Sequence, residues 1–97
     1  MSDDMRIVVS MRANPGREDA VKSAVMACVA PSRAEEGNIS YVAHIDVMEP
    51  SRFVIVEHWK DEHVRDRHLR SDHFKALSRA IDGGQLSEHV FFVLRPL

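Results

Sequence analysis

Side chains that can move protons or stack on aromatic rings gather in the segment 57–73. Glu57 and Trp59 end the apolar run RFVIVEHW, and His68 and His73 lie in the charged run that follows it. A histidine can give and take protons near neutral pH, because its unperturbed pKa is about 6.5. A carboxylate on an apolar face needs a partner, because an unpaired buried charge is costly. These residue types favour acid–base chemistry beside an aromatic wall.

Two successive elements must position these side chains. The residues 52–59 are β-branched and aromatic, which predicts a strand with Ile55, Glu57 and Trp59 on one face. Asp61 is a good N-cap for a helix that follows, and His68 lies on the predicted inner stripe of that helix. We expect a pocket between strand and helix, in which Glu57, Trp59 and His68 are the catalytic candidates. Further expected lining residues are Tyr41, Ile55, His73 and Phe74.

Each candidate also has a purely structural interpretation. His68 is either a general acid or base, or a buried imidazole that hydrogen-bonds to Glu57 or to a backbone carbonyl. His73 favours a structural role, because Ser71-Asp72-His73 is typical of a helix cap. Trp59 is either a stacking surface for a planar substrate or a core aromatic residue. The hydroxyl of Tyr41 either enters the pocket or makes a hydrogen bond at its rim.

The histidine spacing argues against a metal site. Histidines at 58, 63, 68 and 73 recur every five residues. On one helix, five residues turn the chain by about 500°, so successive members would point about 140° apart. Helical ligand pairs need spacings of three or four, so we predict no metal. Arginines alternate with acidic residues in the same run, which is typical of a solvated face, although one arginine at the pocket mouth could meet an anionic substrate.

Composition limits the possible functions. The chain has 97 residues, 44% of them hydrophobic, and a net charge of −2, which predicts one domain without attraction for nucleic acid or anionic membranes. No apolar segment approaches the about 20 residues needed to span a bilayer. The single cysteine, Cys28, fits a reducing cytosol. We expect a disordered leader at 1–4, one domain over 5–97 and a cytoplasmic location.

The order of the predicted elements indicates the fold. Strands are expected at 6–12, 39–48, 52–59 and 88–95, with helices at 17–29, where Pro31 weakens or ends the helix, and from Asp61 and Ser71 onward. This βαββαβ order predicts an α+β, ferredoxin-like antiparallel sheet with its helices on one face. Apolar residues nevertheless fall on both faces, as Val54, Val56 and the run VFFVL show. We therefore expect the uncovered face to pack on a second copy, as a homodimer.

Four motifs together resemble the antibiotic biosynthesis monooxygenase domain of the dimeric α+β barrel superfamily. They are NPGRED, RAEEGNISY, FVIVEHW and HLRSDHF, in that order. The resemblance implies a dimeric barrel and a pocket lined by the Glu-x-Trp strand and the following helix histidine. The haem ligand of the haem-degrading members would fall near Ser78, and the first strand lacks an asparagine, so we expect no haem. The segment 53–59 lacks the asparagine that phenol oxidisers pair with tryptophan, which is a departure from the quinone-forming members.

The resemblance implies a monooxygenase that oxidises a small phenol or quinol with O₂ and uses no cofactor. A base near His68 would deprotonate the substrate, and Trp59 would stack on its ring. An isomerase of a small carbonyl-bearing, quorum-signal-like metabolite is the alternative, with His68 and Glu57 or His73 moving a proton. A small-molecule-binding dimer without catalysis is the third possibility.

Overall fold

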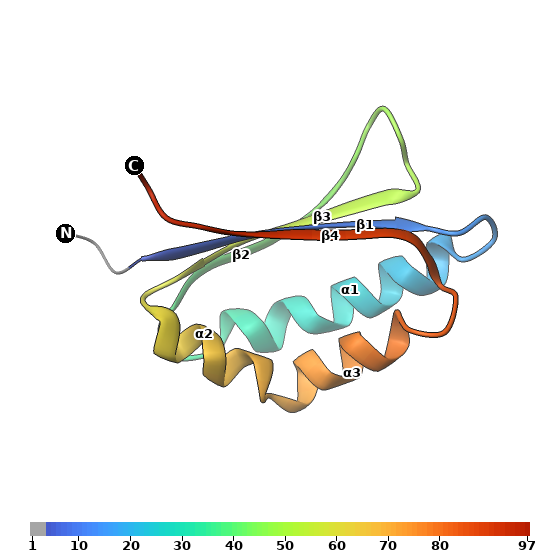
Figure 1. Cartoon of the computed structure of the whole chain (residues 1–97). Helices are drawn as coiled ribbons and strands as arrows, with labels where there is room; N and C mark the ends of the chain where they lie inside the picture. The colour runs from blue at the N-terminus through green and yellow to red at the C-terminus, as the bar shows by residue number, and fades with distance from the viewer. Residues whose placement is uncertain (1–3) are drawn as a thin grey trace.

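The computed structural model describes residues 4–97, which form one antiparallel sheet covered on one face by helices (Figure 1). The strands pair in the order β2-β3-β1-β4, which is the ferredoxin-like arrangement. The predicted fold class is therefore confirmed. The elements are β1 (Met5–Ala13), α1 (Glu18–Arg33), β2 (Asn38–Ile45), β3 (Arg52–Trp59), α2 (Glu62–Leu69), α3 (Asp72–Ala80) and β4 (Leu86–Leu94).

Strand register decides which side chains face the helices. On the inner face Ile7 of β1 pairs with Glu57 of β3, which pairs in turn with Tyr41 of β2. Ile55 and Trp59 share this face of β3 and are buried. The core therefore lies between the inner face and the helices, and the carboxyl group of Glu57 is placed within it.

Two predicted element ends were wrong by three residues or more. Pro31 does not end the first helix, because α1 continues to Arg33 with Pro31 inside it. Strand β2 ends at Ile45 rather than at residue 48. There Oδ1 of Asp46 accepts hydrogen bonds from the backbone N–H groups of Met48 and Glu49, which turns the chain out of the sheet.

The predicted helix caps after β3 are present, and they divide the following segment into two helices. Asp61 accepts a hydrogen bond from the N–H of Val64 and begins α2, and Ser71 accepts one from the N–H of Phe74 and begins α3. The chain changes direction between these helices (Figure 1). The two histidines on either side of the break therefore do not share one helical phase.

A glycine fixes the close approach of α2 to the start of β2. Gly37 has φ +89°, and a Cβ atom there would lie 2.6 Å from a γ carbon of Val64. Both the backbone conformation and the contact favour glycine, because an L side chain at this φ is strained.

The outer face of the sheet carries no helix (Figure 1). Val56 of β3 and Val90, Phe92 and Leu94 of β4 are exposed there, with Phe92 at 55%. No helix within residues 4–97 is long and apolar enough to cross a membrane. The predicted leader lies outside the described residues except for Asp4, whose carboxylate is 2.7 Å from Nε2 of His58.

Candidate active site

A cavity of about 260 Å³ lies between the inner face of the sheet and helices α2 and α3. Its walls are mainly apolar, with a few polar groups among them, as is usual for small-molecule sites. The lining residues are Ile7, Val9, Met11, Tyr41, Ile55, Glu57, Arg65, His68, Leu69, Phe74, Leu77, Ser78, Ile81, His89 and Phe91.

Glu57 supplies a buried carboxyl group to this cavity. Its Oε1 accepts a hydrogen bond of 2.9 Å from the indole N–H of Trp59, which lies on the same face of β3. Burial nevertheless raises the pKa of Glu57 to about 7, and the hydrogen bond from Trp59 and the charge of Arg65 only partly oppose this rise. Glu57 can therefore gain or lose a proton near neutral pH.

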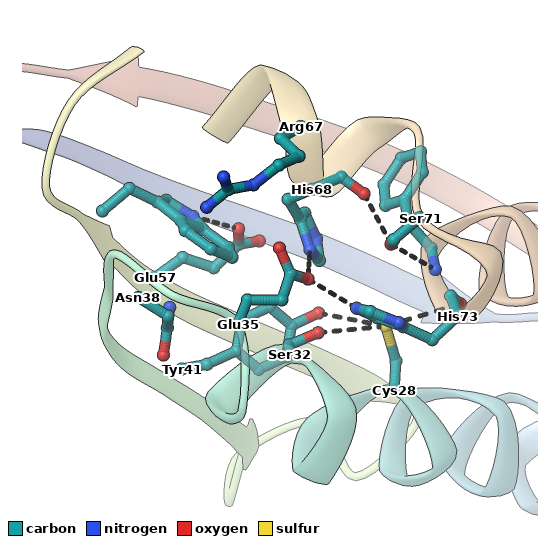
Figure 2. A network of polar contacts seen from close by, with 12 residues as sticks. Cys28, Ser32, Glu35, Asn38, Tyr41, Glu57, Arg67, His68, Ser71 and His73 are labelled. Atoms are coloured by element: carbon teal, nitrogen blue, oxygen red, sulfur yellow. Dashed lines mark hydrogen bonds and ion pairs between the residues drawn. The ribbon is translucent and has the colours of Figure 1, made fainter. Parts of the chain in front are cut away.

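A second carboxylate connects the two histidines at the break between α2 and α3. Oε1 of Glu35, in the turn after α1, lies 2.6 Å from Nδ1 of His68 and 2.5 Å from Nε2 of His73 (Figure 2). An ionised carboxylate only accepts hydrogen bonds, so both nitrogens that face it carry protons. Glu35 thereby fixes the tautomer and the orientation of His68.

The opposite nitrogen of His68 is directed to the cavity. His68 is only 1% exposed, and its Nε2 makes no hydrogen bond with residues 4–97. Within the same residues, no fully buried side-chain nitrogen or oxygen lacks a partner, so Nε2 must retain access to open space. Since His68 lines the cavity, that space is the cavity. Burial also lowers the pKa of His68, which keeps the ring neutral and able to accept a proton.

Trp59 and Tyr41 hold His68 from the sheet side. The ring centroids of Trp59 and His68 are 4.6 Å apart, and those of Tyr41 and His68 are 5.8 Å apart. The hydroxyl of Tyr41 donates a hydrogen bond to Sγ of Cys28 at 3.7 Å, and Sγ donates one to the backbone carbonyl of His73 at 3.6 Å (Figure 2). Burial raises the pKa of Tyr41, so its hydroxyl stays protonated and serves as a donor.

Glu35, His68 and His73 also form a group of metal-ligand types. Their ligand atoms lie within 4.8 Å of one another. The helical-phase argument against a metal site assumed one continuous helix, and the break at Ser71 removes that assumption. Each nitrogen is, however, already hydrogen-bonded to the same carboxylate oxygen, so an ion would have to displace these protons.

The structure brings together most of the predicted site residues. Tyr41, Ile55, Glu57, His68 and Phe74 line the cavity. Trp59 is fully buried beneath it, where it contacts His68 and Glu57. His73 does not line the cavity and lies behind His68.

Two site residues were not singled out by the sequence. Glu35 lies in a connector, and the sequence does not distinguish its carboxylate from a solvated one. The expected hydrogen-bond partner of His68 was Glu57, but in the structure it is Glu35. The arginines of the charged run after β3 were assigned by default to a solvated face, with one of them allowed at the pocket mouth, and the structure shows that Arg65 is the one that lines the cavity. A helical stripe drawn from His68 back to residue 65 could have identified Arg65.

Comparison with known proteins identifies the family. The model of the family "Antibiotic biosynthesis monooxygenase" matches residues 5–80, which is most of the chain. The chain belongs to the antibiotic biosynthesis monooxygenase family. A curated relative, "Putative monooxygenase YcnE" of Bacillus subtilis (strain 168), is 38% identical over 52 residues. That match spans 54% of this chain and 55% of the relative, so it covers about half of each.

Solved structures extend the similarity over the whole chain. The crystal structure of PA3566 from Pseudomonas aeruginosa has a TM-score of 0.92 and 32% identity, covering 100% of this chain and 97% of that one. Rv0793 from Mycobacterium tuberculosis has a TM-score of 0.89 and 25% identity, covering 97% and 95%. The structure of "Putative antibiotic biosynthesis monooxygenase from Nitrosomonas europaea" has a TM-score of 0.91 at 18% identity, covering 100% and 93%, and supports the fold alone.

Proposed function

We propose that this chain is a monooxygenase that oxidises a small phenol or quinol with O₂ and needs no bound cofactor. The observation that carries the proposal is the His68 imidazole, whose Nδ1–H is held by Glu35 while Nε2 borders an apolar cavity. The family and the name of its curated relative support the reaction class.

His68 would act as the general base. Nε2 accepts the proton of the substrate hydroxyl, and Glu35 stabilises the imidazolium that forms. The resulting phenolate is electron-rich and can pass electrons directly to O₂. One oxygen atom enters the ring to give a quinone, and the other leaves as water with two hydrogen atoms from the substrate. Phenol and O₂ thus balance quinone and water, and His68 returns its proton within the same cycle.

The size of the cavity agrees with such a substrate. A cavity of about 150 Å³ is known to hold benzene in another protein, so about 260 Å³ accommodates a substituted aromatic ring. Glu57 offers a second proton-carrying group on the cavity wall, and the apolar walls exclude water from the reacting anion.

Oxygen uptake tests the proposal. Purified protein is supplied with a panel of phenols and hydroquinones, and we expect O₂ consumption with label from ¹⁸O₂ in the product. H68A should lower kcat by about 10² to 10⁴-fold, the usual contribution of general acid–base catalysis. H63A, which alters an exposed histidine of the same helix, is the matched control. Unchanged turnover in folded H68A would exclude the proposed base.

Two outcomes would favour the alternatives. Rearrangement of a carbonyl substrate under anaerobic conditions would favour an isomerase that uses His68 and Glu57. Tight ligand binding without any turnover would favour a binding protein. EDTA treatment completes the test, since the proposed reaction continues after chelation.

We also propose that the protein is a homodimer that pairs through the outer face of the sheet. The exposed side chains of Val56, Val90, Phe92 and Leu94 support this arrangement, because monomers rarely leave such a face in water.

A further inference from the structure

We propose that Arg65 makes the cavity selective for aromatic acids, by binding an anionic substituent such as a carboxylate on the substrate ring. This inference deepens the proposed function and rests on it for the identity of the ring.

Arg65 is a half-buried cation in an otherwise mainly apolar cavity. It is the one arginine or lysine among the lining residues, which come from the described part of the chain. Arg65 lines the same cavity as Glu57 and His68, and its positive charge partly opposes the rise in the pKa of Glu57 and adds to the lowering of the pKa of His68. A ligand in the cavity can therefore contact this charge.

The Arg65 side chain has no polar partner among residues 4–97. Its guanidinium makes no hydrogen bond or ion pair with residues 4–97. By contrast, Arg52 pairs with Asp46 and Glu88, and Arg67 donates a hydrogen bond of 2.7 Å to the carbonyl of Glu36. A guanidinium presents a rigid fork of donors that matches a carboxylate, so Arg65 is free to receive one.

The charge of Glu57 does not prevent binding of an anion. Because burial raises the pKa of Glu57 to about 7, this carboxyl group can be protonated at neutral pH while Arg65 stays charged. The apolar side chains of Ile7, Val9 and Phe91 would then contact the ring. The proposed ligand therefore has an aromatic body, an anionic group toward Arg65 and a hydroxyl toward His68.

Binding of paired ligands tests the inference without any turnover. The protein has one tryptophan, Trp59, which lies against His68, so its fluorescence can report occupancy of the cavity. The probes are 4-hydroxybenzoate and its neutral counterpart 4-hydroxybenzamide, with phenyl phosphate as a second anion. We expect wild-type protein to bind both anions at least 10-fold more tightly than the amide, because hydrogen bonds to charged groups are strong.

Charge-removing variants assign the selectivity to one residue. R65Q should weaken 4-hydroxybenzoate binding by about 10- to 100-fold and change amide binding less than twofold. R70Q removes the same charge from an exposed position of the same segment outside the lining and should change neither. R65K should restore part of the affinity. The thermal midpoint of each variant shows whether it is folded.

Three results would overturn the inference. These are equal affinity of the wild-type protein for acid and amide, equal losses in R65Q and R70Q, and a loss of kcat for neutral phenols in R65Q without any loss of anion binding. The last result would mean that Arg65 stabilises the phenolate instead. The two proposals can fail separately. If the protein binds anions selectively through Arg65 but consumes no O₂, this inference stands and the proposed oxidation is wrong.

Discussion

The indole N–H of Trp59 donates a 2.9 Å hydrogen bond to Oε1 of Glu57, two residues earlier on the same strand face. This contact satisfies a carboxyl oxygen that would otherwise be buried without a partner. It does not offset the cost of burial, since the pKa of Glu57 still rises to about 7. The pair therefore combines a stable position with a proton that can exchange near neutral pH, at the wall of the cavity.

Glu57 should make the folded state less stable as the pH rises. The pKa rises from 4.5 to about 7 on folding, so the folded state binds the proton more strongly. The associated stability is complete below pH 4.5 and is lost as the pH rises through about 7, and it amounts to about 3 kcal/mol. The free energy of unfolding of E57Q should therefore exceed that of wild type by about 3 kcal/mol at pH 8, and the two should differ little at pH 4.5.

Urea unfolding at both pH values measures this difference. The lowered pKa of His68 acts in the opposite direction, because its stability contribution is lost as the pH falls below 6.5, but His68 is present in both proteins and cancels. E36Q, at an exposed glutamate, is the control. A pH-independent difference between E57Q and wild type would contradict the assignment of the raised pKa to Glu57.

Glu35 should control the tautomer of His68. In E35Q the amide oxygen can accept a hydrogen bond from one imidazole. The amide N–H₂ group can only donate, so it requires an acceptor nitrogen on the other imidazole. We expect kcat to fall at least about 10-fold with little change in KM, because the substrate does not contact Glu35. Nitrogen NMR of the histidine rings should show loss of the Nδ1–H form of His68.

The H73Q variant leaves the Glu35 carboxylate in place and keeps a hydrogen-bond donor at position 73. Glutamine at 73 can still donate a hydrogen bond to Glu35, so the effect on turnover should be smaller than that of E35Q. A Nδ1–H tautomer of His68 that persists in E35Q would refute the positioning role of Glu35.

A charge on the outer sheet face should separate the proposed dimer. F92E introduces a carboxylate at a side chain that is 55% exposed in the single chain, and its burial in an interface would be costly. We expect light scattering to change from a dimer mass to a monomer mass. M26E adds the same charge at a 55% exposed position on α1 and should leave the mass unchanged. A wild-type monomer at micromolar concentration would exclude the dimer.

Alanine at position 37 should destabilise the fold. G37A forces a side chain onto a backbone with φ +89° and places Cβ 2.6 Å from a carbon of Val64. We expect the free energy of unfolding to fall by about 1–3 kcal/mol. The lower end of this range corresponds to backbone strain alone. G37A/V64A should recover part of this loss if the contact contributes, which a double-mutant cycle measures. G16A, at a positive φ without a contact within 4 Å, isolates the strain.

Local patterns predicted most of the fold, whereas long-range contacts decided the site. The two-residue period placed Ile55, Glu57 and Trp59 on one face, and short polar side chains located both helix caps. The hydrogen bond between Glu35 and His68 joins positions 33 residues apart, which no local period encodes. The end of β2 was misplaced because Asp46 turns the chain with backbone hydrogen bonds that apolar alternation does not reveal.

The double contact of Glu35 also has a consequence for how a ligand enters. His68 and His73 are both fastened to this carboxylate, so the ends of α2 and α3 at the break are anchored to the turn after α1. The cavity wall also includes Phe91 of the edge strand β4, whose side chain is 57% exposed. Opening at the anchored end would break two hydrogen bonds, whereas opening beside β4 breaks none of them. Substrate should therefore enter and product leave between α3 and β4, with the reacting group leading toward His68.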